Sequence, residues 1–204
     1  MKNDCTGVIL AGGRNSRFSG KNKALMPVAG KRILDRIYEV FTHLFDNILL
    51  VTNDPLQYIS WNFDIVTDIF PFRSALTGLH TGLFYITTPY AFFAACDIPF
   101  IKKELVEILF DGLEPGIDIV IPETPKGVEP LCAIYSKRCV KPMEEHLLKK
   151  SFKIQHMFQK VRVKKIPETI LRTVDPDLVS FSNINTPEDL AKAEERLMTQ
   201  VSHL

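Results

Sequence analysis

A short segment near the amino end combines glycines with cationic side chains. Its members are Gly12, Gly13, Arg14, Arg17, Lys21 and Lys23. Backbone N–H groups of a glycine-rich turn can approach a ligand closely and form an anion-binding concavity. Lysine adds a point charge and arginine a forked pair of donors, and both suit phosphate oxygens. The segment predicts a polyphosphate site, with a solvated basic loop as the alternative.

The distribution of charge strengthens this prediction. The whole chain has a formal net charge of +1, yet no acidic residue occurs between Asp4 and Asp35. Lys31 and Arg32 extend the basic set. Because the chain as a whole is nearly neutral, this cluster of cations indicates a local anion site.

Two common phosphate-binding motifs do not fit the segment. The Walker pattern requires glycine where Asn15 stands, and serine or threonine where Asn22 follows Lys21. The dinucleotide pattern fails because Gly12-Gly13 is not followed by a third glycine at the required spacing. An NAD-linked oxidoreductase is therefore disfavoured.

An aspartate follows the most apolar run of the chain. Residues 91–96 are apolar throughout and stop at Asp97. Such a run predicts a buried strand, and ligands bind at the carboxyl ends of strands in open α/β sheets. A carboxylate there suits Mg²⁺, which takes oxygen ligands and bridges nucleotide phosphates. The alternative is an aspartate that caps the helix after the strand.

Apolar periodicity predicts the elements that must position these side chains. The expected strands are 8–11, 47–52, 64–67, 90–96, 117–121, 130–135 and 161–163, and the expected helices are 33–44, 76–86, 103–110, 138–148 and 187–197. Residues 122–127 are expected to form a turn-rich loop. This alternation predicts an α/β fold with a mostly parallel, covered sheet, in one domain spanning residues 1–204.

Composition narrows the class of protein. Of 204 residues, 46% are hydrophobic and 24% are charged, which is typical of a globular protein. The net charge of +1 disfavours nucleic acid as a partner, and the longest apolar run is too short to span a bilayer. Neither a signal-peptide pattern nor a zinc-binding cysteine pattern is present. Cys96 and Cys132 are expected to be reduced core thiols, and the protein is expected to be cytoplasmic.

Three segments together resemble one enzyme family. Residues 10–25 fit L-A-G-G-x-x-x-R-x-x-G-x-x-K-A-L, residues 96–100 fit C-D-x-P-[FY], and residues 183–190 fit N-[IV]-N-T-P-E-[DE]-L. These motifs resemble those of the molybdenum cofactor guanylyltransferases (MobA family), which are nucleotidyltransferases with a Rossmann-like, three-layer, glycosyltransferase-A type fold. The resemblance runs from Thr6 to about Arg196. Ser74-Ala75 replaces the family's usual Gly-Pro, and we expect a looser loop there.

The resemblance implies a role for particular residues of this chain. Asp97 is implied to bind Mg²⁺ and the nucleotide, and Arg17 and Lys23 to hold the β- and γ-phosphates. The residues implied to contact the nucleotide are Leu10, Ala11, Gly12, Gly13, Lys23, Asn53, Asp68 and Asp97. Asn183 and Asn185 are implied to lie on the acceptor side, with the alternative that they only brace a turn.

The implied reaction moves GMP from GTP to the phosphate of molybdopterin-bound molybdenum and releases pyrophosphate. Cofactor-synthesis proteins or recipient enzymes are possible transient partners. A cytidylyltransferase for molybdopterin or another small phosphate is the nearest alternative, although those relatives usually read L-A-A-G where this chain has Ala11-Gly12-Gly13. A catalytically silent nucleotide-binding adaptor is the other alternative, and retention of Arg17, Lys23 and Asp97 argues against it.

Overall fold

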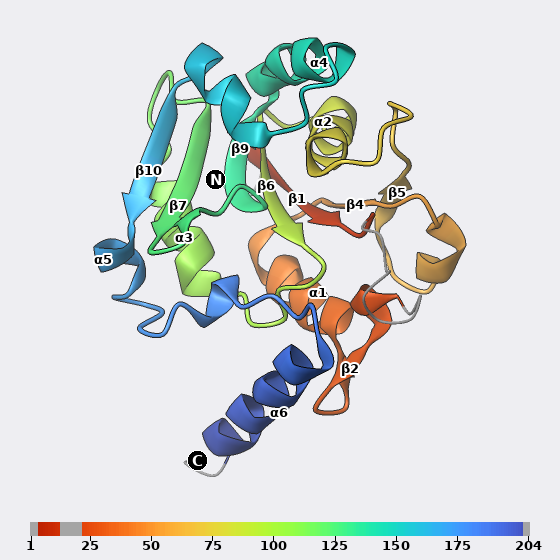
Figure 1. Cartoon of the computed structure of the whole chain (residues 1–204), viewed down its shortest axis with the longest axis vertical. Coiled ribbons are helices and arrows are strands. Elements are labelled where there is room, and N and C mark those ends of the chain that lie inside the picture. The colour runs from red at the N-terminus through yellow and green to blue at the C-terminus, as the bar shows by residue number, and fades with distance from the viewer. Residues whose placement is uncertain (1–3, 13–21, 202–204) are drawn as a thin grey trace.

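One mixed sheet runs through the molecule (Figure 1). The computed structural model describes residues 4–12 and 22–201. In that part of the chain eight strands form the sheet, in the order β10-β7-β9-β6-β1-β4-β5, with β8 paired to β7. They are β1 (Cys5–Leu10), β4 (Ile48–Val51), β5 (Asp64–Val66), β6 (Tyr90–Ala95), β7 (Ile119–Thr124), β8 (Gly127–Val128), β9 (Cys132–Ser136) and β10 (Val163–Pro167).

Helices cover both faces of this sheet. The α-helices are α1 (Ile33–Leu44), α2 (Ala75–Tyr85), α3 (Lys103–Asp111), α4 (Val140–Leu148), α5 (Glu168–Leu171) and α6 (Pro187–Val201). Short 3-10 turns include η3 (Lys23–Leu25), η4 (Pro55–Tyr58), η5 (Lys137–Cys139), η6 (Ile154–Lys160) and η7 (Val179–Phe181). Figure 1 shows α2 and α4 on one side of the sheet and α1 on the other.

Neighbouring strand residues belong to different cores, as expected for a sheet buried on both faces. Ile9 and Phe92 pack in the core that contains α1 and α3 residues. Val8 and Phe93 pack in the core that contains α2 and α4 residues. The predicted three-layer α/β architecture is therefore confirmed.

Most of the sheet is parallel, as predicted. β1 pairs in parallel with β4 and β6, β4 with β5, and β10 with β7. β9 runs antiparallel to both β6 and β7. An apolar run predicts burial but carries no direction, so the sequence did not predict that β9 is reversed.

The order in which the chain adds strands to the sheet changes direction at β1. From β1 the sheet grows outward through β4 and β5, and the chain then returns to place β6 on the other side of β1. Leu10 lies beside Ala95 at the shared carboxyl edge. This is the topological switch point, where open α/β sheets leave a crevice for a ligand.

The prediction of a loop at residues 122–127 was wrong. β7 continues to Thr124 and forms a hairpin with β8. The Thr124 hydroxyl donates to the Gly127 carbonyl at 3.0 Å, and Gly127 has a φ of 113°, which glycine tolerates. The predicted strand at 161–163 likewise starts later, as β10, where it pairs with β7.

Lys31 and Arg32, which extended the predicted basic set, lie outside the main sheet and are paired with acidic residues. They form β3 (Lys31–Arg32), which pairs with β2 (Pro27–Val28) in a separate two-stranded ribbon. Lys31 pairs with Glu39, and Arg32 Nε donates to Asp35 Oδ2 at 2.7 Å. Acidic residues of α1 therefore neutralise both charges, a consequence of folding that sequence spacing does not reveal.

α2 packs so closely on the sheet that adding one methyl group at Gly82 is expected to destabilise the fold. A Cβ at Gly82 would come within 2.6 Å of Phe93 Cε1, while a Cβ at Gly78 would meet Leu10 Cδ2 at 3.3 Å. We expect Gly82→Ala to lower the free energy of unfolding by about 1–3 kcal/mol, because the core is overpacked. Gly78→Ala is the matched control. There the higher helix propensity of alanine offsets the cost of the milder contact, so we expect little change in the free energy of unfolding. Urea titration measures both, and equal stability of the two variants would contradict this packing argument.

Candidate nucleotide-binding site

A cavity of about 320 Å³ lies at the switch point. It is bordered by the ends of β1, β4 and β6 and by the start of α2. Its lining residues are Leu10, Ala11, Gly12, Lys23, Val51, Asp68, Arg73, Ser74, Ala75, Gly78, Ala95, Cys96, Asp97 and Leu131. The structure thus gathers segments that lie far apart in the sequence around one space.

The ends of the central strands are fixed by backbone hydrogen bonds beyond the regular ladders. The Ala11 N–H donates to the Val51 carbonyl at 2.9 Å, and the Cys96 N–H donates to the Leu10 carbonyl at 3.0 Å. Gly12 follows directly, and no atom of the described residues lies within 4 Å of where its Cβ would stand. Glycine therefore leaves open space at the cavity wall for a close backbone approach to a ligand.

Lys23 enters the cavity from η3, and Asn22 anchors that turn. The Asn22 Oδ1 accepts from the Ala24 N–H at 3.1 Å, while its Nδ2 donates to Gln57 Oε1 at 2.6 Å and to the Tyr58 hydroxyl at 2.7 Å. Lys23 Nζ donates to Asn185 Oδ1 at 2.6 Å. Sequence analysis missed the anchoring function of Asn22, although asparagine before a helical turn is a recognised N-cap signal.

Asp97 lines the same cavity, two residues after the end of β6. Its Oδ1 is buried and has no hydrogen-bond partner among residues 4–12 and 22–201. Burial raises the pKa of the Asp97 carboxyl, and the positive charge of Lys23 partly opposes that shift. An unpaired buried oxygen is costly, so it indicates a missing ligand at this position.

Asp68 and Asn53 form a pair at the ends of β5 and β4. Asn53 Nδ2 donates to Asp68 Oδ2 at 2.7 Å, and the Asp68 N–H donates to Asn53 Oδ1 at 3.3 Å. Burial raises the pKa of Asp68, while the Asn53 hydrogen bond and the charge of Arg73 lower it. Asp68 lines the cavity and Asn53 does not. Asn53 is thus hydrogen-bonded to a residue of the cavity lining, and its contact with the nucleotide stays a prediction.

The segment before α2 is held by a side-chain cap. Ser74 Oγ accepts from the Thr77 N–H at 3.1 Å and lies 2.9 Å from Thr77 Oγ1. The loop expected to be loose because Ser74-Ala75 replaces Gly-Pro is therefore fixed in another way. It presents Arg73 to the cavity, a cation that sequence analysis did not single out. Its only signal in the sequence is its position directly before the helix cap.

The cysteines behave as predicted for core thiols. Cys132 is buried, and Cys96 is partly buried and borders the cavity. Burial raises the pKa of the Cys96 thiol to about 12, and the nearby Asp97 carboxylate adds to that shift. The thiol is therefore protonated at neutral pH and unsuited to nucleophilic attack.

The two asparagines of the acceptor-side prediction face different surroundings. Asn185 contacts Lys23, whereas Asn183 lines a second and larger cavity. The Ile184 N–H between them donates to the Asp97 carbonyl at 2.9 Å. Thr186 and Asp189 form a capping box at the amino end of α6. Asp189 Oδ2 accepts from the Thr186 N–H at 2.9 Å, and the Asp189 N–H donates to the Thr186 hydroxyl at 3.1 Å.

Part of the predicted phosphate site lies outside the described residues. Those positions are Gly13, Arg14, Arg17 and Lys21. Of the remaining predicted site residues, the structure brings Leu10, Ala11, Gly12, Lys23, Asp68 and Asp97 to one cavity. Among the residues it describes, no group of three or more His, Cys, Asp or Glu side chains is placed to hold a metal.

The fold and this cavity define a class of protein. A parallel α/β sheet with a glycine turn, a lysine and a buried carboxylate at its switch point is typical of nucleotide-binding enzymes. The profile of the MobA-like NTP transferase domain matches residues 7–164.

Known proteins resemble the chain over nearly its whole length. A molybdenum cofactor guanylyltransferase of Desulfosudis oleivorans is 47% identical over 189 residues, covering 93% of this chain and 94% of that protein. A probable molybdenum cofactor guanylyltransferase of Natranaerobius thermophilus is 35% identical, covering 97% and 98%. The crystal structure of molybdopterin-guanine dinucleotide biosynthesis protein A from Archaeoglobus fulgidus has a TM-score of 0.84 and 29% identity, covering 95% and 99%. The chain belongs to the MobA-like NTP transferases and, within them, to the molybdenum cofactor guanylyltransferase family; it is a nucleotidyltransferase.

Proposed function

We propose that this nucleotidyltransferase moves GMP from GTP to the phosphate of a molybdopterin-type acceptor and releases pyrophosphate. The observation that carries the proposal is the placement of Asp97 and Lys23 in one cavity at the switch point. Membership of the family supports the choice of GTP and of the acceptor.

Lys23 is proposed to hold the β- and γ-phosphates together with Arg17. Charge accumulates on the departing pyrophosphate as the bond to the α-phosphate breaks, and a fixed ammonium stabilises that charge. The contact with Asn185 holds the lysine at the cavity before the nucleotide binds. Since the acceptor phosphate is already anionic, catalysis consists mainly of positioning and charge stabilisation, without a strong general base.

Asp97 is proposed to be the protein ligand of Mg²⁺. Its buried Oδ1 without a partner fits a hard cation, and Mg²⁺ commonly takes only one or two carboxylates together with phosphate oxygens and water. When bound at Asp97, such an ion would supply positive charge that stabilises the negative phosphate groups.

The base is proposed to lie against the strand ends. Leu10, Ala11 and Gly12 offer apolar surface and backbone groups, with Gly13 continuing the segment. Asp68 supplies an acceptor for the nucleoside and Asn53 orients it through the hydrogen bond between their side chains. Asn183 and Asn185 are proposed to lie on the acceptor side.

The enzyme is proposed to work as one domain spanning residues 1–204, in the cytoplasm, with transient contact to cofactor-synthesis proteins or recipient enzymes. Within the described ranges, no helix is both long and apolar enough to cross a membrane. The net charge of +1 supports neither nucleic acid nor an anionic membrane surface as a partner.

A nucleotide panel tests the proposed reaction. Purified protein is incubated with molybdopterin carrying molybdenum, Mg²⁺ and each NTP in turn, and pyrophosphate release is measured. We expect release with GTP, its loss on adding EDTA, and its recovery with excess Mg²⁺. Release with CTP but not with GTP would instead establish a cytidylyltransferase. GTP binding without pyrophosphate release from any NTP would establish a silent adaptor.

A further inference from the structure

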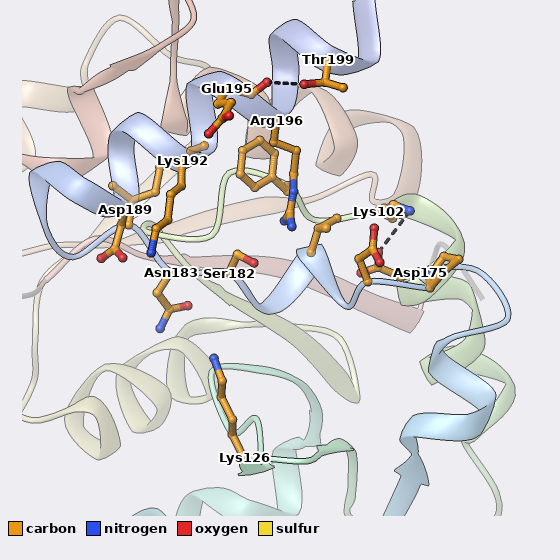
Figure 2. A pocket seen from close by; sticks show the side chains of 16 residues that line it. Lys102, Lys126, Asp175, Ser182, Asn183, Asp189, Lys192, Glu195, Arg196 and Thr199 are labelled. Carbon is orange, nitrogen blue, oxygen red and sulfur yellow. Dashed lines mark hydrogen bonds and ion pairs between the residues drawn. The ribbon is translucent and has the colours of Figure 1, made fainter. Parts of the chain in front are cut away.

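A second cavity, of about 690 Å³, is lined in part by the segment 182–184. Its walls come from four parts of the chain: the segment 100–102, the turn between β7 and β8, the segment 175–184 and α6 (Figure 2). Its volume falls within the range of small-molecule sites. None of the roles proposed for the nucleotide uses this space.

Two of the acidic side chains that line the cavity, those of Asp175 and Asp189, already bind other groups of the protein. Asp175 is fully buried, and its Oδ2 accepts from the Ser180 N–H at 2.9 Å. Lys102 Nζ lies 3.2 Å from Asp175 Oδ1, a charge contact without the alignment of a hydrogen bond. Asp189 Oδ2 accepts from the N–H groups of Asn185 and Thr186, just before α6, and these bonds lower the pKa of that carboxyl. The exposed Asp177 and Glu195 complete the acidic groups in the lining.

Three cations converge on the cavity from opposite sides. Figure 2 shows Lys192 and Arg196 pointing down from α6, with Lys126 pointing up from the β7–β8 turn toward Asn183. Their side-chain nitrogens make no hydrogen bond and no ion pair with any residue in the described ranges. Three charged groups from distant parts of the chain, none of them held by a hydrogen bond or ion pair to a described residue, indicate a site for an anion.

The segment 183–185 connects this cavity to the reacting centre. Asn183 and Ile184 line the larger cavity, while Asn185 binds Lys23 and the Ile184 N–H binds the Asp97 carbonyl. An acceptor molecule that crosses this segment would have one end beside the nucleotide and the other in the larger cavity. Residues 183–185 therefore border the larger cavity and also contact two residues of the nucleotide cavity, Lys23 and Asp97.

We propose that the larger cavity binds the anionic end of the acceptor that is remote from the reacting phosphate, with Lys126 and Arg196 as specificity-determining residues. This inference rests on the proposed transfer of GMP. Lys126 and Arg196 close on the anion from opposite walls, and Lys192 adds charge at the edge. The site takes a compact group of high negative charge and selects acceptors that carry one in addition to their phosphate.

Steady-state kinetics and equilibrium binding test this site. Lys126→Met and Arg196→Met are each expected to raise the KM for molybdenum-bearing molybdopterin about tenfold, and the double variant about a hundredfold, with kcat and the KM for GTP within about twofold of wild type. Calorimetric titration with the same acceptor, without GTP, should show an equal weakening of Kd. Added salt should weaken acceptor binding to the wild type more than to the double variant.

The matched control is Lys141→Met combined with Lys149→Met, which removes the same charge from exposed positions at α4 on the other face of the sheet. It is expected to keep the wild-type acceptor KM. If wild type transfers GMP but the Lys126/Arg196 double variant retains the wild-type KM and Kd, the anion site is wrong and the proposed function stands. If wild type neither binds nor modifies the acceptor, both fail together.

Discussion

Asp97→Asn is expected to lower kcat/KM for GMP transfer by about a thousandfold while the protein stays folded. Asparagine has nearly the same shape but carries no negative charge to hold Mg²⁺ against the phosphates. The measurement is pyrophosphate release at saturating Mg²⁺ and varied GTP. A wild-type rate in this variant would remove the proposed metal ligand.

Thermal unfolding separates this loss of activity from a loss of fold. Burial raises the pKa of Asp97 above its usual value of 3.8, so the folded state disfavours the charged form. For a carboxyl shifted upward, the neutral form stabilises the fold at low pH, and that stabilisation is lost as pH rises through the folded-state pKa. At pH 7 the carboxylate is therefore a destabilising group that Asn removes.

We accordingly expect the Tm of Asp97→Asn at pH 7, without metal, to equal or exceed that of wild type. The difference in Tm between Asp97→Asn and wild type should become smaller as the pH falls toward 3.8. Asp111→Asn, an exposed aspartate at the end of α3, is the control and should change neither activity nor Tm. A clearly lower Tm of Asp97→Asn at pH 7 would show that the carboxylate is structural.

Lys23→Met is expected to lower kcat about a hundredfold or more, because the charge that forms on pyrophosphate loses its ammonium partner. The methionine stem fills nearly the same volume, so the apolar contacts of η3 are kept. The decrease should appear in kcat as well as in the KM for GTP, since the charge is greater in the transition state than in bound GTP.

Lys31→Met is the control for Lys23→Met. Lys31 lies in the same acid-poor stretch of sequence, but the structure pairs it with Glu39 on the surface. We expect Lys31→Met to retain wild-type kcat and KM. Equal losses in the two variants would mean that a diffuse basic surface, and not the geometry of Lys23, supports catalysis.

The sequence alone predicted the layered fold and the edge of the sheet at which the cavity lies. Apolar runs such as residues 90–96 can be buried only as strands covered on both faces, and the polar residue that ends such a run must lie at an edge. Asp97 was predicted at a strand end from its apolar run, whereas Asp68 was singled out by the family resemblance, and the structure puts both in one cavity. Local sequence patterns are enough to predict a strand and its end, because both depend on the types of residues that are neighbours in the sequence.

Other features required contacts between distant residues, which no local pattern contains. The direction of β9 depends on its pairing with β6 and β7. The ion pair of Lys31 with Glu39 takes that cation out of the basic set, and the Lys23–Asn185 contact joins residues 162 positions apart. The convergence of Lys126 with Arg196 likewise exists only after α6 has docked. Sequence determined which groups stand at the ligand edge, and tertiary structure decided which charges remain available to a ligand, because pairing depends on distance in space.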